Sequence, residues 1–298
     1  MMKRPNVLIQ IAILFGIMAL SLFLCLYLAL FLLPPLFGVS DATAFFASIE
    51  LQKQNVYASL FIQSLSSAVG MFLLPALIFS QVMRYPIGDF FKVNKLPSLI
   101  QLALALIIIV CGGIFINLIV TFSQQIPLPE SFASLRNGQE TTDELLQSFF
   151  SIKTSAHFLL LAFTLALLPA LAEEFFFRGV LQNLFLQIGA SPLRAMITAG
   201  LAFSLMHLAF DNFLAIWLMG FVLGWLYYYS GSLWTSIFAH FVNNLSVVLL
   251  KYAFFIGITQ KDWTASETPI AWYLSIGTGV IMTAGLWLMK KLQATKTA

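Results

Sequence analysis

Residues 155–188 read SAHFLLLAFTLALLPALAEEFFFRGVLQNLFLQI. A run of this length can cross the hydrocarbon core of a bilayer, which takes about 20 apolar residues in a helix. Near its middle, however, it carries Glu173, Glu174 and Arg178. Charged groups inside a bilayer cost about 3 kcal/mol or more each, and they are candidates for function by default. The stretch therefore predicts a membrane-spanning helix that contains a polar site.

The composition of the whole chain agrees with a membrane protein. Of its 298 residues, 60% are apolar and only 9% are charged, against roughly 25% charged in an average soluble domain. This excludes a soluble globular enzyme, whose surface needs more charge, and a disordered chain, which needs low hydrophobicity. The net charge of +3 comes from short loops and tails rather than from a basic stripe, so we expect no nucleic-acid partner.

The apolar pattern predicts an all-α, polytopic integral membrane protein with about eight transmembrane helices and an intramembrane polar active site. The predicted spans are residues 7–37, 56–82, 97–122, 155–188, 193–210, 213–229, 233–252 and 270–289. Three parts follow from them. Residues 1–150 hold the first three helices and an extramembrane loop, residues 151–255 a core of four helices, and residues 256–298 the last helix and a basic tail.

The distribution of lysine and arginine over the loops predicts the orientation in the membrane. With a cytoplasmic N-terminus, the cytoplasmic side holds the larger group, Lys3, Arg4, Arg84, Lys92, Lys95, Arg194, Lys290, Lys291 and Lys296. The opposite side holds Lys53, Arg136, Lys153, Lys251 and Lys261. This bias is the one that the positive-inside rule describes. We therefore expect a multi-pass protein of a cell membrane, of the bacterial inner-membrane kind, with both termini in the cytoplasm.

Helix geometry separates the charged residues of the stretch 155–188. Glu174 and Arg178 are four residues apart, so they share a helix face and can form an ion pair. Glu173 points elsewhere, because successive residues turn by about 100°. It has no partner within its own helix, and an unpaired carboxylate is free to do chemistry.

Three further polar residues lie in the predicted spans, namely His207, His240 and Asn244. His240 and Asn244 are four residues apart and share a face of one helix. Counted from the predicted helix ends at 1.5 Å per residue, Glu173 and His207 both lie about 21–22 Å deep. His240 and Asn244 lie about 10 and 16 Å deep by the same rise. These groups could converge in one layer if their helices are neighbours.

A carboxylate, two imidazoles and a carboxamide suit the activation of water and the stabilisation of an oxyanion. The carboxylate can take a proton from water, one imidazole can orient the water, and the other groups can donate hydrogen bonds to the oxyanion. Alternatively, Glu173, His207 and His240 could hold Zn²⁺ with a water in the open position. Both arrangements can hydrolyse an amide, and the residues alone do not choose between them.

The order of these motifs resembles a known family. Glu-Glu-x-x-x-Arg at 173–178, Phe-x-x-x-His at 203–207 and His-x-x-x-Asn at 240–244 are similar to the CPBP intramembrane protease family. This family is also called the CAAX amino-terminal protease or Abi family, and it includes the endopeptidase that trims prenylated CAAX proteins. The stretches at 220–227 and 231–234 also look typical of prokaryotic members. The resemblance covers roughly residues 160–250.

The resemblance implies roles for the matching residues. Glu173 would be the general base with His207 assisting, and His240 and Asn244 would form the oxyanion site. Glu174 and Arg178 would be a structural pair. The implied function is an intramembrane endopeptidase, often classed as a metalloprotease, that cleaves a membrane protein or a lipidated, CAAX-like peptide in the bilayer. The alternative is a non-catalytic membrane protein, such as a bacteriocin-immunity factor or scaffold. A secondary transporter is disfavoured, since the chain lacks an inverted repeat.

Overall fold

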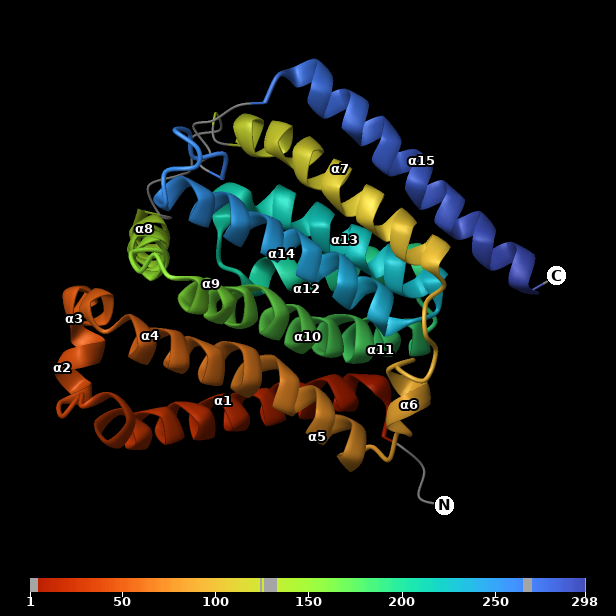
Figure 1. Ribbon diagram of the computed structural model, residues 1–298. Helices are drawn as coiled ribbons and strands as arrows, with labels where there is room; N and C mark the ends of the chain where they lie inside the picture. Colours follow the sequence, from red (N-terminus) through yellow and green to blue (C-terminus); the bar gives the residue numbers. More distant parts are fainter. Residues whose placement is uncertain (1–4, 124, 126–132, 265–269, 298) are drawn as a thin grey trace.

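The computed structural model describes residues 5–123, 125, 133–264 and 270–297, and these residues contain helices and no strands (Figure 1). The helices are α1 (Val7–Phe37), α2 (Ala42–Ala47), α3 (Ile49–Gln54), α4 (Val56–Gln63), η1 (Ser64–Leu73), α5 (Leu74–Val82), α6 (Ile87–Phe90), α7 (Leu99–Ser123), α8 (Ala133–Phe149), α9 (Ser155–Leu161), η3 (Ala162–Leu167), α10 (Leu168–Glu174), η4 (Phe175–Gln182), α11 (Asn183–Gln187), α12 (Pro192–Met206), η5 (Phe210–Asn212), α13 (Phe213–Ser230), α14 (Leu233–Phe255) and α15 (Trp272–Thr297). The fold is therefore that of a polytopic all-α membrane protein, as predicted.

Seven helical stretches among the described residues are long and apolar enough to cross a membrane. They are Val7–Phe37, Val56–Val82, Leu99–Ser123, Ser155–Gln187, Phe213–Ser230, Leu233–Phe255 and Trp272–Ala294. The predicted span at 193–210 is shorter than expected, because α12 ends at Met206 after 15 residues. The chain then turns through Leu208, which has a φ of +52°. The apolar pattern runs past this turn, which is why the sequence predicted a longer helix.

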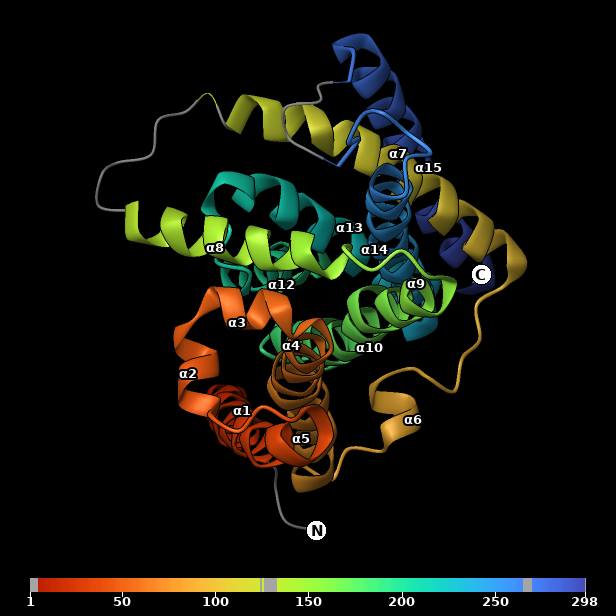
Figure 2. The same ribbon diagram turned by 60° about the vertical axis from the view of Figure 1, so that its left-hand side comes forward.

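The helices form a bundle with the stretch α9–α11 at its centre (Figures 1 and 2). α7 and α15 pack against each other at one edge, and α1 packs against η1 and α5 at the other. Between these edges, α10 contacts η1 on one side and α14 on the other. α12 packs along α13 and also contacts η4. The long central helix is thus surrounded by the helices that carry the other polar residues.

Two of the spans change from α-helical to π-helical geometry before a proline. η1 ends two residues before Pro75, and η3 ends two residues before Pro169. Proline lacks an N–H and its ring clashes with the carbonyl of the preceding turn, and a wider turn relieves both problems. The central helix is therefore widened just before Pro169. A third π-helical segment, η4, follows Glu174 and has no proline. π-helical turns are frequent at functional sites.

The short helices α2 and α3 and the amphipathic helix α8 lie together at one end of the bundle (Figure 2). Lys53 on α3 joins them, with its Nζ atom 2.7 Å from Glu144 Oε2 on α8 and 3.1 Å from Glu50 Oε1. α1 begins and α15 ends at the opposite end (Figure 1). The seven long spans and the shorter helix α12 together cross the bundle an even number of times, so α1 begins on the same side on which α15 ends.

Candidate active site

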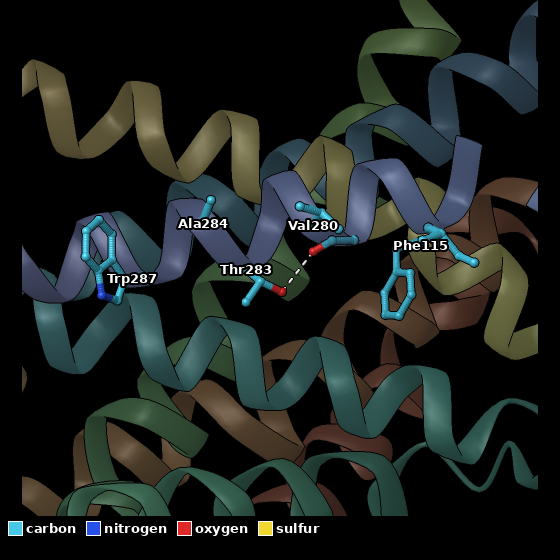
Figure 3. A pocket seen from close by; sticks show the side chains of 7 residues that line it. Phe115, Val280, Thr283, Ala284 and Trp287 are labelled. Carbon is cyan, nitrogen blue, oxygen red and sulfur yellow. Dashed lines mark hydrogen bonds between the residues drawn. The ribbon is translucent and has the colours of Figure 1, made fainter. Parts of the chain in front are cut away.

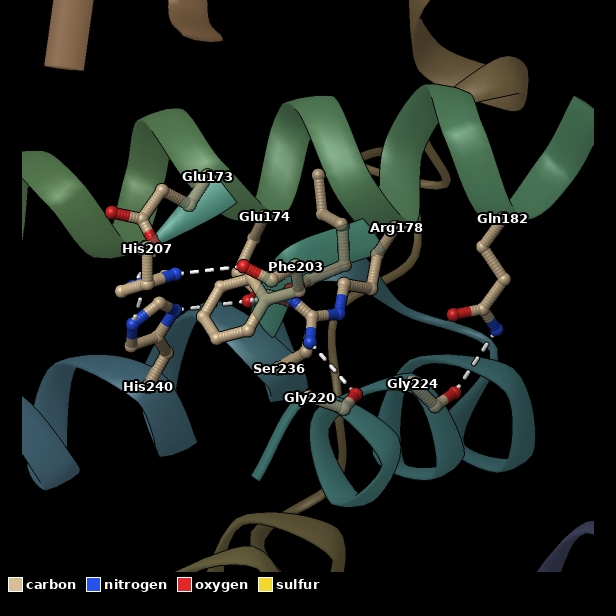
Figure 4. A network of polar contacts seen from close by, with 11 residues as sticks. Glu173, Glu174, Arg178, Gln182, Phe203, His207, Gly220, Gly224, Ser236 and His240 are labelled. Carbon is tan, nitrogen blue, oxygen red and sulfur yellow. Dashed lines mark hydrogen bonds and ion pairs between the residues drawn. The ribbon is translucent and has the colours of Figure 1, made fainter. Parts of the chain in front are cut away.

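Glu174 and Arg178 form the predicted ion pair, and both are completely buried (Figure 4). Arg178 Nη1 donates to Glu174 Oε1 at 2.6 Å, and Arg178 Nη2 donates to the carbonyl oxygen of Gly220 at 2.8 Å. The guanidinium also lies over the ring of Phe203, 4.8 Å from its centroid. Removing one member of such a buried pair costs about 3–5 kcal/mol, because the other charge is left uncompensated. The pair therefore fixes the central helix against α13.

His240, on α14, contacts both carboxylates of the central helix. Its Nδ1 atom lies 2.9 Å from Glu174 Oε1, and its Nε2 atom lies 3.8 Å from Glu173 Oε2. An ionised carboxylate can only accept, so Nδ1 carries the hydrogen of this hydrogen bond. The bond orients the ring and turns Nε2 towards Glu173. Glu174 therefore does more than neutralise Arg178, because it also positions an imidazole of the candidate site.

His207 reaches the same place from the end of α12. Its Nδ1 atom donates to the carbonyl oxygen of Phe203 at 2.7 Å, and its Nε2 atom lies 4.0 Å from Glu173 Oε2. Nδ1 carries the hydrogen here as well, since a backbone carbonyl oxygen only accepts. About a third of the His207 side chain is exposed, against 13% for Glu173 and 5% for His240. His207 is thus the most accessible member of the centre.

The three predicted groups therefore converge on a single atom, Glu173 Oε2. This oxygen is buried and has no hydrogen-bond partner within the described residues. Two imidazoles, each held through Nδ1, turn Nε2 towards it from 3.8 and 4.0 Å. Figure 4 shows the three side chains gathered at one end of the polar network, with Arg178 and Gln182 farther along the central helix. A carboxylate flanked in this way can take a proton from a small molecule held between the three groups.

Asn244 is one turn beyond His240 on α14, as the spacing predicted. Its Oδ1 atom accepts a hydrogen bond from Asn243 Nδ2 at 3.2 Å. Among the described residues, no hydrogen bond joins Asn244 to Glu173, His207 or His240. Asn243, which was not identified from the sequence, is the hydrogen-bond donor to Asn244.

The proposed zinc ligands Glu173, His207 and His240 are close together, but the two imidazoles lie farther from the carboxylate oxygen than the ligands of one tetrahedral zinc ion lie from each other. Ligand atoms at about 2.0–2.1 Å from a tetrahedral zinc lie roughly 3.3–3.4 Å apart. Here the Nε2 atoms are 3.8 and 4.0 Å from the carboxylate oxygen. Within the part of the chain that the structure describes, no group of three or more His, Cys, Asp or Glu side chains is arranged to hold a metal.

Close backbone contacts bring the helices together around this network. A Cβ atom on Gly220 would lie 2.9 Å from the Cα atom of Gly200, so the backbones of α12 and α13 approach closely at these two glycines. A Cβ atom on Gly224 would lie 2.8 Å from Gln182 Oε1, and Gln182 Nε2 donates to the Gly224 carbonyl oxygen at 3.1 Å. Arg178 and Gln182 thus bond to carbonyls one turn apart on α13. The sequence did not identify Gln182, although its i,i+4 spacing from Arg178 was a usable signal.

One surface groove among the described residues lies away from this centre. An apolar groove of about 650 Å³ runs along α15 beside Phe115 of α7 (Figure 3). Its lining contains no ionisable side chain. The remaining histidine, His157, is buried at the start of α9, where its Nε2 atom is 2.6 Å from the carbonyl oxygen of Phe149. This contact ties α9 to the end of α8 and gives His157 no part in the polar network.

The fold and the site together define a class of protein, a polytopic helical membrane protein with a carboxylate–imidazole centre buried among its helices. Residues 155–246 match the family model described as Type II CAAX prenyl endopeptidase Rce1-like. The match contains all six residues singled out from the sequence, and it confirms the resemblance to the CPBP (CAAX protease) family. No curated protein and no solved structure matches the chain.

Proposed function

We propose that the protein is an intramembrane endopeptidase that cleaves a peptide bond in a membrane-associated, lipid-modified protein or peptide. The observation that carries the proposal is the approach of His207 Nε2 and His240 Nε2 to the same oxygen, Glu173 Oε2, at 4.0 and 3.8 Å. The Rce1-like match over residues 155–246 supports a CAAX-type protease in general. The detailed mechanism and the substrate class are our own proposal and extend beyond that match.

The reaction begins with water held between Glu173 and His207. A water molecule hydrogen-bonded to both at about 2.8 Å fits a separation of 4.0 Å, since the two bonds meet at roughly a right angle. His207 Nε2 accepts one hydrogen of the water, because its Nδ1 hydrogen is already donated to the Phe203 carbonyl. Glu173 Oε2 takes the other hydrogen as a proton while the water oxygen bonds to the substrate carbonyl carbon. The same proton then passes from Glu173 to the leaving amine nitrogen as the C–N bond breaks.

The carbonyl oxygen of the substrate becomes negatively charged in the tetrahedral intermediate and needs hydrogen-bond donors. We assign this role to His240 and Asn244. Because the Nδ1 hydrogen of His240 is donated to Glu174, Nε2 can donate only when the ring is an imidazolium. The carboxylates of Glu174 and Glu173 lie 2.9 Å and 3.8 Å from the two ring nitrogens. The Nδ2 amide group of Asn244 supplies the second donor after a change of its side-chain rotamer.

The surroundings of His207 favour a substrate that arrives through the lipid. Leu205, Leu208 and Leu214 flank the turn at the end of α12, and their side chains are 55%, 62% and 47% exposed. An exposed surface of leucines beside the site suits an apolar chain better than a water-soluble peptide. A lipid group on the substrate would occupy the bilayer beside this turn while the peptide bond reaches Glu173. The family description, which names prenyl endopeptidases, agrees with a prenyl group in this position.

The experiment is a cleavage assay with the purified full-length protein in lipid nanodiscs. Matched peptides with and without a prenylated cysteine are the substrates, and mass spectrometry locates the cut. We expect cleavage next to the modified cysteine, and we expect the unmodified peptide to be cleaved at least tenfold more slowly. Leu208→Asp, which puts a charge on this exposed leucine surface without changing Glu173, should lower the rate for the prenylated peptide. Equal rates for the two peptides would contradict the proposed substrate class.

We also propose that both termini lie in the cytoplasm. The end of the bundle at which α1 begins and α15 ends carries Arg84, Lys95, Arg194 and Lys290, which agrees with the positive-inside rule. Labelling of single cysteines from outside intact cells tests this orientation. A cysteine at position 190 should stay unlabelled, and one at position 260 should react.

A further inference from the structure

A polar pocket separate from the candidate active site lies next to the loop between α6 and α7, at the end of the bundle at which α1 begins. Three backbone carbonyl oxygens of this loop accept hydrogen bonds from residues at the start of α14. The carbonyl of Lys92 accepts from Leu233 N at 3.5 Å, that of Val93 accepts from Trp234 Nε1 at 2.9 Å, and that of Lys95 accepts from Ser232 Oγ. The loop is thus fixed to the turn between α13 and α14 and holds its side chains in defined positions.

Lys92 occupies an unusual position in this loop. Its φ of +57° is in the left-handed region, which side chains other than glycine rarely adopt and which often marks functional positions. Its ammonium group lies 4.5 Å from the centroid of the Tyr227 ring, and it forms no ion pair with any described residue. Burial, and then repulsion by Lys95, lower the pKa of Lys92 below its usual value. The fold therefore holds a partly buried ammonium group without a counter-charge.

The pocket in front of Lys92 has a volume of about 330 Å³. This is at the lower end of the range for small-ligand sites, about 300–1,000 Å³. Its lining consists of Asp89, Phe90, Lys92, Asn183, Leu186 and Gln187. Asp89 Oδ1 accepts a hydrogen bond from Asn94 Nδ2 at 2.6 Å, and the carboxylate forms no ion pair with any described residue. One positive and one negative group thus line the same pocket without neutralising each other.

The chemistry of the lining identifies the kind of ligand. A simple anion would meet Asp89, and a simple cation would meet Lys92, whereas a molecule that carries both charges is matched by both. The pocket is lined by the segment that joins the spans Val56–Val82 and Leu99–Ser123 and by the end of the span Ser155–Gln187, a level at which the headgroups of a bilayer would surround it. We propose that this pocket binds the headgroup of a phospholipid with a primary ammonium, its phosphodiester at Lys92 and its ammonium at Asp89.

Native mass spectrometry of the full-length protein tests the proposal. Phosphatidylethanolamine or phosphatidylglycerol is titrated into the detergent-solubilised protein, with soluble phosphoethanolamine and inorganic phosphate as competitors. We expect the wild type to prefer phosphatidylethanolamine. Lys92→Gly removes the ammonium and suits the left-handed backbone, so it should fold and bind this lipid roughly ten- to a hundredfold more weakly. Asp89→Asn should reduce binding of phosphatidylethanolamine but not of phosphatidylglycerol. Lys95→Gln, an exposed lysine of the same loop, is the matched control and should not change binding.

Three results would overturn the proposal. The first is unchanged retention of phosphatidylethanolamine by Lys92→Gly. The second is an equal loss in Lys95→Gln, which would indicate general attraction to the basic end of the bundle. The third is equal affinity for both lipids together with displacement by inorganic phosphate, which would indicate a free-anion site. The thermal unfolding of each variant is measured alongside, and a second substitution, Lys92→Gln, checks that any loss comes from the missing charge.

Discussion

Glu174 Oε1 lies 2.9 Å from His240 Nδ1, so a carboxylate paired with an arginine of its own helix also holds an imidazole of another helix. The same oxygen accepts a hydrogen bond from Arg178 at 2.6 Å. Through these contacts the buried ion pair determines where His240 Nε2 points. Glu173 and Glu174 are adjacent in the sequence, yet one is held by a buried network and the other is left for chemistry.

Substitution of Glu174 should affect both stability and activity. Glu174→Ala leaves Arg178 buried without its partner, and we expect a loss of about 3–5 kcal/mol and little folded protein. Glu174→Gln keeps the shape and can still accept from His240 through its carbonyl oxygen, but it removes the charge that stabilises an imidazolium. We expect this variant to fold less stably and to have a kcat at least tenfold lower. Thermal unfolding and cleavage kinetics in detergent check both results.

A normal kcat for Glu174→Gln would contradict the role of Glu174 in positioning and charging His240. Glu144→Gln is the matched control. Glu144 is an exposed glutamate on α8 that pairs with Lys53 and is absent from the polar network, so its substitution should leave kcat unchanged.

The contact between α12 and α13 should not tolerate a methyl group at Gly220. A Cβ atom there would lie 2.9 Å from Gly200 Cα and 3.2 Å from Gly200 O, and backbone atoms cannot move aside as a flexible side chain can. We expect Gly220→Ala to destabilise the protein by about 1–3 kcal/mol. The measurement is the midpoint of thermal unfolding in a fixed detergent.

Gly113 and Gly277 provide the comparison for Gly220. Both are in helices, and a Cβ atom on either would meet no atom within 4 Å. Alanine at these positions should leave stability unchanged or raise it by up to about 1 kcal/mol, as helix propensity predicts. A loss at Gly113 equal to that at Gly220 would show that the close approach to Gly200 is not the cause.

Treatment with a chelator should not change the rate of cleavage. The distances of 3.8 and 4.0 Å from Glu173 Oε2 to the two imidazoles suit an intervening water better than ligands that share a zinc ion. We expect the rate to be the same after prolonged incubation with 1,10-phenanthroline and removal of the chelator. Inactivation that is reversed by Zn²⁺ and not by Mg²⁺ would show instead that the three residues close around a metal.

Local spacing predicted part of the site, and contacts between distant residues determined the rest. The i,i+4 rule was sufficient for the pair Glu174–Arg178, because both residues are on one helix. The depths of Glu173 and His207 indicated a common layer, but whether the helices are neighbours depends on packing that the pattern does not contain. The bond from His240 to Glu174 was not predicted, because the residues are 66 positions apart. The predicted face shared by His240 and Asn244 is present, but among the described residues no hydrogen bond joins Asn244 to Glu173 or His207.

The fold, like the site, was predicted only in part from the sequence. Apolar runs of about 20 residues predicted the long spans, since length and hydropathy are sufficient for a lipid-exposed helix. The end of α12 at Met206 was not predicted, because the apolar pattern continues on both sides of the turn. The π-helical segment η4 contains no proline, so its sequence gives no such signal, and two of its side chains, Arg178 and Gln182, donate hydrogen bonds to carbonyl oxygens of α13.

The central claim is that Glu173 is the base that activates water. The most direct measurement is the rate of substrate cleavage by Glu173→Gln beside its thermal stability. Glu173 Oε2 has no hydrogen-bond partner among the described residues, so the substitution breaks no hydrogen bond at this atom. We predict that the variant unfolds at the wild-type temperature or above it, and that its rate falls by a factor of about 100 to 10,000. A folded Glu173→Gln variant that cleaves the substrate at the wild-type rate would contradict the account.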